Sequence, residues 1–220
     1  MIQPNIINFL KNIKNNNSKA WFDTHRKEYE EAKSNFLLLI ENLIKGISSF
    51  DADIANLGAK ECVFRINRDV RFSKDKRPYK NNMAAYFNRA GKKGTGAGYY
   101  LHIEPGNSFA AAGIWMPEPA DLSKIRQEID YNFDEWNKIT SSKTFQQQFD
   151  KGVDMNSTLV RPPKGYDVEN PAIKFIKLKS FVATRALPDR DLKVTTFVAD
   201  VTKTFKASQP FINFINRSLD

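Results

Sequence analysis

The order in which helix-like and strand-like stretches follow one another is the strongest constraint on the fold of this chain of 220 residues. Apolar residues recur at helical spacing near both ends, whereas the middle contains short stretches rich in aromatic and β-branched residues. The helices therefore flank a contiguous block of strands and do not alternate with them. This order predicts an α+β fold with a mainly antiparallel sheet over about residues 60–116 and helices on both sides of it.

Before the sheet, we predict helices within residues 1–50. Ser18 can cap a long helix that continues to about Ile47, because Phe22, Tyr29 and Phe36 recur at seven-residue steps. After the sheet we predict a mixed helical region over residues 117–220, in which Pro119 opens the first helix. A chain of this length can bury its core as one unit, so we predict a single domain over residues 1–220.

Four stretches read as strands, namely Val63–Phe72, Met83–Phe87, Tyr99–Ile103 and Phe109–Trp115. The residues between the last two, Glu104–Asn107, have the sequence Glu-Pro-Gly-Asn, which is turn chemistry. The last two strands are therefore predicted to form a hairpin.

Composition limits the environment of the protein and its chemistry. The longest strongly apolar run, Phe36–Ile40, is far shorter than the roughly 20 residues that cross a bilayer. The first residues show no cationic leader followed by an apolar block, so we expect no signal peptide and a cytoplasmic protein without a membrane partner. Cys62 is the single cysteine, which excludes an internal disulfide and a multi-cysteine metal site.

Positive charge is concentrated in one segment. The formal net charge is +9, and residues 60–93 contain eleven Lys or Arg against three acidic residues. Such a cluster attracts anionic partners by Coulomb forces. In the predicted strand Val63–Phe72, alternation places Phe64 and Phe72 on an apolar face and Arg65 and Arg71 on the opposite, polar face. Arg68 falls on the apolar side, where it must find a carboxylate or carbonyl oxygens, extend to solvent, or lie at a bulge that returns it to the polar face.

This segment is the candidate binding site. Guanidinium groups suit planar contact with phosphate or carboxylate, and lysines add mobile positive charges. We therefore expect an anionic small molecule as the ligand, with Asp69 orienting an arginine and Tyr79 at the rim. The candidate ligand-binding residues are Arg65, Arg68, Asp69, Arg71, Lys76, Tyr79 and Lys80.

Two alternatives remain open for the same residues. The basic segment could bind nucleic acid, although few aromatic residues are interleaved for base stacking beyond Tyr79 and Tyr86. It could also be an internal ion-pair network without a ligand, because Asp69 and Asp75 lie within the segment and the acidic residues Glu28, Glu30 and Glu31 of the long helix could also neutralise the arginines. In that case the protein would be a structural or partner-binding module.

Other potential sites are weaker. His102 alternates with Tyr100 and Glu104 and could give an acid–base pair or two metal ligands, but the sequence indicates no third ligand and no metal site. The glycine-rich stretch Gly91–Gly98 lacks the lysine of a phosphate-binding loop and leads into a strand. Cys62 has no assignable base and is expected to be an inert buried thiol. The sequence names no nucleophile and no cofactor, so it leaves open whether the protein is an enzyme.

Several strings occur in an order that resembles the family called domain of unknown function 2461. They are NNNSKAWFDTHRKEYEEA, FRINRDVRFSKDKRPYKNNMAAYF, GYYLHIEPGNSFAAAGIWMPEPADLSKIRQEI, RPPKGYD, LKSF and the final PFINFINRSL. The resemblance covers essentially the whole chain and implies one full-length domain. It also implies that Arg65, Arg68, Asp69, Arg71, Phe72, Lys76, Pro78, Tyr79 and Lys80 belong to the family signature. It implies no mechanism, because the family has no established activity.

Overall fold

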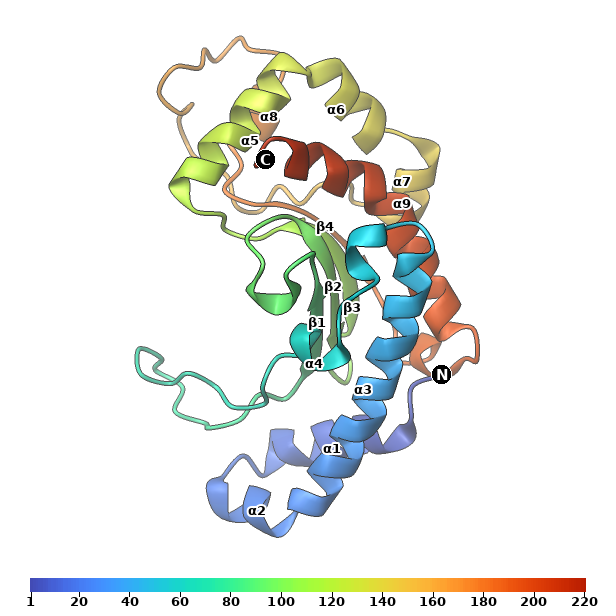
Figure 1. Cartoon of the computed structure of the whole chain (residues 1–220). Coiled ribbons are helices and arrows are strands. Elements are labelled where there is room, and N and C mark those ends of the chain that lie inside the picture. Colours follow the sequence, from blue (N-terminus) through green and yellow to red (C-terminus); the bar gives the residue numbers. More distant parts are fainter. The chain divides into compact units, whose positions relative to one another are not determined.

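Four strands pair in the order in which they occur in the chain, and they form one antiparallel sheet, β1-β2-β3-β4 (Figure 1). The strands are β1 (Met83–Phe87), β2 (Gly98–Ile103), β3 (Phe109–Ile114) and β4 (Phe181–Ala186). The computed structural model describes all residues from 1 to 220. The predicted α+β class and the antiparallel sheet are confirmed, but β4 lies far outside the predicted range of the sheet.

The predicted hairpin is present. β2 and β3 are joined by a tight turn in which the Asn107 N–H donates to the Glu104 carbonyl oxygen at 2.9 Å. Gly106 has a φ of 80°, a conformation that glycine adopts without steric cost. The Ser108 hydroxyl donates to the same Glu104 carbonyl oxygen at 2.8 Å. Glu104, at the end of β2, is thereby fixed by its own turn.

The chain divides into two compact units. The first consists of Met1–Lys93, Tyr100–Ala110 and Ala186–Lys203, and the second of Gly94–Tyr99, Ala111–Arg185 and Thr204–Asp220. Strand β1 belongs to the first unit, together with the whole segment that carries the predicted binding residues. The expectation of a single domain stays a prediction.

Helices of the first unit pack through the stripes that the sequence indicates. They are α1 (Pro4–Asn15), α2 (Lys19–Thr24), α3 (Arg26–Ser48) and α4 (Ala59–Cys62), with short 3₁₀ turns η1 (Ala52–Ile54), η2 (Gly91–Lys93) and η3 (Asp191–Lys193). Helix α1 buries Ile6, Phe9, Leu10 and Ile13 and packs against α3. The thiol of Cys62 is fully buried at the end of α4, and burial raises its pKa to about 11, as expected for an inert cysteine.

The predicted long helix from Ser18 is in fact two helices. The Ser18 hydroxyl accepts the Trp21 N–H, so the predicted cap is confirmed, but the chain leaves helical geometry at His25, with φ −106° and ψ 19°. The imidazole of His25 lies 2.9 Å from the Trp21 carbonyl oxygen and stacks on the Trp21 ring. The His25 N–H donates to the same carbonyl oxygen at 3.1 Å, so the His25 ring and backbone share one acceptor at the point where the helix breaks.

The second unit is built around one indole ring. Its helices are α5 (Pro119–Tyr131), α6 (Phe133–Thr140), α7 (Lys143–Gln148), α8 (Ile173–Ile176) and most of α9 (Phe197–Arg217). Pro119 occupies the first turn of α5 as predicted. Trp136 is fully buried, and its ring lies within 6.0 Å of the rings of Phe175, Phe181, Phe211 and Phe214. None of the helices of the protein combines the length and the apolar character that a membrane span requires.

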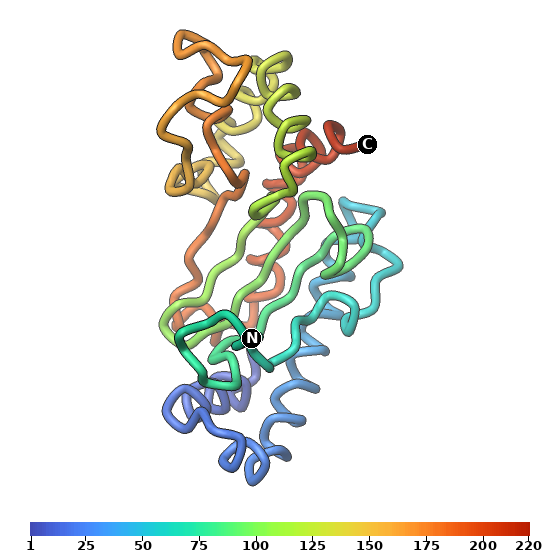
Figure 2. The backbone as a smooth tube through the Cα atoms, turned by 90° about the vertical axis from the view of Figure 1, so that its left-hand side faces the viewer, coloured from blue at the N-terminus to red at the C-terminus, as the bar shows by residue number.

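Residues Arg65–Lys80, which we call the basic loop, do not form the predicted strand. They make a long irregular excursion with only one isolated bridge, Asn67 to Tyr79 (Figures 1 and 2). The ring of Phe72 is 96% exposed, so the prediction that Phe72 belongs to an apolar face is wrong, whereas Ile66 of the same predicted face is buried. Two aspartates explain the difference, because Asp69 accepts the Arg71 N–H and Asp75 accepts the Arg77 N–H. Such turns, closed by a side chain two residues back, compete with strand pairing.

Candidate functional site

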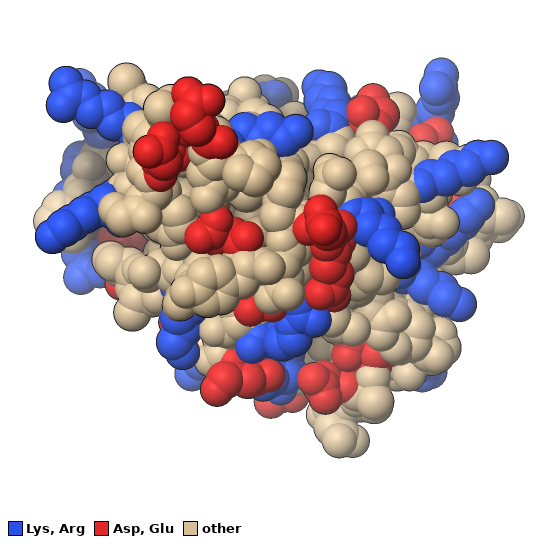
Figure 3. Space-filling view, turned by 90° about the horizontal axis from the view of Figure 1, so that it is seen from above, with Lys and Arg blue, Asp and Glu red and all other residues tan.

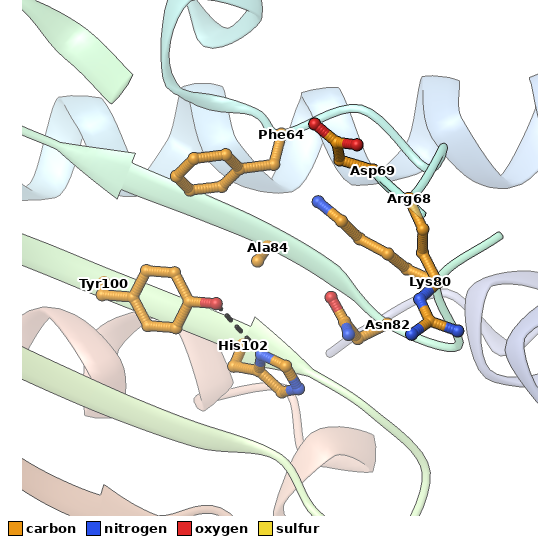
Figure 4. A pocket seen from close by; sticks show the side chains of 8 residues that line it. All are labelled: Phe64, Arg68, Asp69, Lys80, Asn82, Ala84, Tyr100 and His102. Atoms are coloured by element: carbon orange, nitrogen blue, oxygen red, sulfur yellow. Dashed lines mark hydrogen bonds between the residues drawn. The ribbon is translucent and has the colours of Figure 1, made fainter. Parts of the chain in front are cut away.

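The basic loop, the residues that lead into β1 and one face of β2 enclose an open pocket of about 440 Å³ within the first unit (Figure 4). We call it the anion pocket. Its lining residues are Phe64, Arg68, Asp69, Lys80, Asn82, Ala84, Tyr100 and His102. Three of the predicted ligand-binding residues, Arg68, Asp69 and Lys80, therefore meet in one place.

Lys80 lines this pocket and forms no ion pair with a carboxylate. Its half-buried side chain makes no ion pair, and its Nζ lies over the Phe64 ring, 5.6 Å from the centroid (Figure 4). Burial lowers the pKa of Lys80, and the charge of Arg65 lowers it further. An ammonium group in this position is stabilised by any anion that enters the pocket.

The two other charged side chains of the pocket have partners within the basic loop. The carboxylate partner of Arg68 is Asp75, whose oxygen lies 2.6 Å from the Arg68 NH1 atom. The same NH1 atom also donates a hydrogen bond to the Arg77 carbonyl oxygen. Asp69 receives Arg71 in a two-point contact, with nitrogen–oxygen distances of 3.0 and 2.7 Å. Arg71 lowers the pKa of Asp69, so this carboxylate is ionised but already neutralised by its neighbour.

The remaining predicted residues lie outside the anion pocket. Tyr79 is not at a rim: its ring is 7% exposed and stacks on Phe22 with centroids 4.1 Å apart, while its N–H donates to Asn17. Lys76 is exposed and donates to the Val70 carbonyl oxygen. Arg65 is exposed and lines a different pocket. The predicted row of Arg65 and Arg71 on one strand face is therefore wrong.

The proposed neutralisation of the arginines by the acidic stretch of α3 is also wrong in its details. None of the acidic residues Glu28, Glu30 and Glu31 forms an ion pair with the basic loop, and Glu30 instead pairs with Lys33 on its own helix. The ion pairs of the basic loop are local, between Arg68, Arg71 or Arg77 and the aspartates Asp69 and Asp75.

A chain of hydrogen bonds runs along the wall of the anion pocket on β2. The Glu104 carboxylate accepts the Asn81 amide at 2.6 Å and the Asn107 amide at 3.2 Å, which fixes its position. It lies 3.2 Å from His102 Nε2, which we assign as the protonated ring nitrogen. Nδ1 of His102 is then an acceptor, and the Tyr100 hydroxyl donates to it at 3.1 Å (Figure 4).

The environment of this Tyr100–His102–Glu104 chain favours the neutral forms of Tyr100 and His102. Burial lowers the pKa of His102, the contact with Glu104 opposes this shift, and the charge of Lys80 adds to it. Burial raises the pKa of Tyr100 to about 12. The His102 ring also stacks on Phe109, with centroids 4.7 Å apart. The chain is thus fixed in place with Tyr100 and His102 both in their neutral forms, and His102 is the member that can accept a proton from a ligand in the pocket.

The combination can hold an anion and exchange a proton with it. Lys80 supplies the charge, the Asn82 amide supplies neutral donors, and the Tyr100–His102–Glu104 chain supplies a base. No group of three His, Cys, Asp or Glu side chains in the protein could hold a metal ion.

Asn82 and Phe64 are pocket residues that the sequence does not single out. Asn82 directly precedes β1, and its place beside Lys80 depends on where the basic loop returns to the sheet. Tyr100 and His102 could be found from strand alternation alone. Their neighbours across the pocket could not, because those come from a segment of irregular backbone.

Comparison with known families decides what kind of chain this is. The model of the family described as "Conserved hypothetical protein (DUF2461)" matches residues 5–214, which is essentially the whole sequence. The chain belongs to this family. Neither the curated proteins nor the solved structures include a match to it. Membership confirms the resemblance seen in the sequence and leaves the activity to be argued from the site itself.

Proposed function

We propose that this member of the DUF2461 family binds a small anionic ligand, one that carries a phosphate or carboxylate group, in the anion pocket. Lys80 and the Asn82 amide contact the anionic group, and Arg68 contributes positive charge from the edge. Tyr100 and His102 face the same space and exchange a proton with the ligand if the ligand has an ionisable group. Arg65 and Lys76 act at longer range through their charge, whereas the charge of Arg71 is neutralised by Asp69.

One observation carries this proposal. Lys80 is a half-buried ammonium group without a carboxylate partner, and it lines a pocket together with the Asn82 amide and the Tyr100 hydroxyl. Burial of an unpaired charge costs free energy. An anionic ligand lowers this cost because it supplies the partner that the ammonium group lacks in the free protein. Asp69 does not cancel this attraction, because Arg71 neutralises it.

The test is a thermal-shift titration of the whole protein with inorganic phosphate, pyrophosphate and succinate, followed by NMR of the histidines. At 100 times its Kd, a ligand adds about 2.7 kcal/mol of stability. The substitution Lys80→Met removes this gain, whereas the control Lys74→Met keeps it, because Lys74 is exposed and lines no described pocket.

The histidine titration locates the anion. Burial is the main cause of the lowered pKa of His102, but the charge of Lys80 contributes. An anion on Lys80 therefore raises the His102 pKa in the unchanged protein, whereas in Lys80→Met this pKa is already higher and does not respond. Equal stabilisation of the unchanged protein and of Lys80→Met, with no movement of the His102 pKa, would contradict the proposal.

A nucleic-acid partner stays the second hypothesis. On the face drawn in Figure 3, lysines and arginines are interspersed with acidic residues and do not gather into one basic area. The basic loop carries the exposed aromatic ring of Phe72 among cations, which is the one feature that favours stacking on a base. Binding of oligonucleotides would show a slope of about −0.9 in log K against log salt for each phosphate neutralised on duplex DNA.

A further inference from the structure

A second pocket of about 450 Å³ lies within the first unit, on the other side of Phe64 and Asn82, which line both pockets. Helix α3 contributes one of its faces, and the rest comes from α4, the residues after it, the start of β1 and η2. The lining residues are Tyr29, Lys33, Phe36, Leu37, Lys60, Val63, Phe64, Arg65, Ile66, Asn82, Met83 and Lys92.

The floor of this pocket is apolar. Phe36, Ile66 and Met83 are at most 6% exposed, and they present their side chains from three different elements. Leu37 and Phe64 are half-buried and continue the apolar surface toward the mouth. The volume lies within the range of about 300–1,000 Å³ that is usual for small-molecule sites, which are mostly apolar with a few polar groups.

The rim of the same pocket is cationic. Lys33, Lys60, Arg65 and Lys92 line it, and no acidic residue does. Arg65 and the Lys60 ammonium make no ion pair, and Lys92 uses its ammonium only to donate to the Lys60 carbonyl oxygen at 2.7 Å. Lys33 alone has a carboxylate, the exposed Glu30 at 3.2 Å.

We propose that this pocket binds a free amphiphilic anion, a molecule with an apolar body and one carboxylate or phosphate head. The apolar body packs on Phe36, Ile66 and Met83, and the head pairs with Arg65 and the lysines of the rim. Charge complementarity selects this ligand class, because a neutral apolar molecule leaves the cations unsatisfied and a small hydrophilic anion leaves the floor exposed to water. The site has cations of its own, since none of them lines the anion pocket, although Phe64 and Asn82 line both pockets.

The test is isothermal titration of the whole protein with monomeric decanoate, octanoate and decanol. Decanoate binds, and octanoate binds about fourfold more weakly for each of its missing methylenes that the pocket buries, as expected from about 0.8 kcal/mol per buried CH₂. Decanol binds at least tenfold more weakly, because it has no charge for the rim. Equal binding of decanol and decanoate, or no binding of decanoate, would overturn the proposal.

Matched variants of α3 locate the apolar body. Leu37→Asp places a carboxylate in the pocket and reduces decanoate affinity at least tenfold. Leu38→Asp is the control, because Leu38 is the next residue, is 54% exposed and does not line the pocket. A circular-dichroism melt of both variants confirms that they fold. If Leu38→Asp weakens decanoate as much as Leu37→Asp does, the pocket is not the binding site.

Variants of the cations locate the head group and separate the two proposals. Arg65→Met weakens decanoate about tenfold and leaves decanol unchanged, whereas Lys80→Met leaves decanoate unchanged. Loss of decanoate binding in Lys80→Met but not in Arg65→Met would place the ligand in the anion pocket and overturn this inference. Failure of phosphate in the anion pocket, with decanoate still bound, would contradict only the proposed function.

A lipid surface offers the same head-group chemistry as a free amphiphile. Vesicles of phosphatidylglycerol distinguish the two sources. A protein that binds these vesicles but not monomeric decanoate recognises a surface, which contradicts a site for a single molecule. Binding of decanoate without vesicle binding supports the free ligand.

Discussion

Arginines of the basic loop and the single arginine at the end of α9 carry the same charge, but the sequence separation between each arginine and its ion-pair partner differs. Arg71 and Arg77 pair with aspartates two residues away. Arg217 pairs with Glu128 of α5 and Glu135 of α6, which lie 89 and 82 residues away in the sequence. The first kind of pair shapes a loop, whereas the second connects three helices.

This difference in sequence separation indicates which arginines can exchange their partner for a ligand without loss of the fold. A local pair needs no tertiary structure, so its loss changes the shape of the loop and little of the fold. A pair between distant helices closes a long stretch of chain, and its loss affects the folded state as a whole. The basic loop is attached to its unit by the buried side chains of Tyr79 and Ile66 and by two hydrogen bonds between Tyr79 and Asn17, and not by an ion pair.

The largest effect is expected for Tyr79→Ala. This substitution removes a buried ring that stacks on Phe22, and truncation of a buried aromatic side chain costs about 3–5 kcal/mol. Urea denaturation measures the loss. Phe72→Ala is the control, because the 96% exposed Phe72 ring should change stability by no more than about 0.5 kcal/mol. A comparable loss in both variants would contradict the assignment of Tyr79 as an anchor of the basic loop.

A smaller effect is expected for Arg217→Ala, at about 1 kcal/mol, because the pairs are partly exposed and such pairs are individually weak. Arg217 lowers the pKa of Glu135 below its ordinary value of 4.5. A carboxyl with a lowered pKa in the folded state contributes stability that is present above pH 4.5 and lost as the pH falls through the folded value. Melts from pH 7 to pH 3 should show the difference between the two proteins shrinking below pH 4.5. A difference that stays constant over this range would mean that Arg217 acts through packing on Phe214.

The smallest effect is expected for Arg71→Ala. Its guanidinium is 76% exposed and pairs only with Asp69, so the melting temperature should not change measurably. The same melt decides between the two views of the basic loop that the sequence leaves open. A large loss would show that Arg71 is part of an internal ion-pair network, and the comparison with Arg217 would fail.

Sequence patterns predict the parts of this fold that depend on neighbours in the chain. The helical stripe at Phe36, the cap at Ser18 and the turn at Gly106 all follow from local spacing and residue type. Strand β4 does not, because its pairing with β3 follows a long helical stretch and no local pattern assigns Phe181–Ala186 to the same sheet.

The candidate site was predictable to a similar extent. Composition identifies the basic segment, and alternation on β2 brings Tyr100, His102 and Glu104 to one face. The strand assumed for Val63–Phe72 fails because the aspartate side chains bond to the backbone two residues on, which a hydrophobic pattern does not register. For this reason Arg65 and Arg68, which lie three residues apart in the sequence, line different pockets.

Cys62 has a practical consequence. It is the only thiol in the chain and is fully buried, so a thiol reagent can reach it only when α4 moves away from its packing. The labelling rate of the unaltered protein therefore reports how often this part of the first unit opens. Because α4 also contributes Lys60 to the second pocket, slower labelling in the presence of a ligand registers occupancy without any introduced probe.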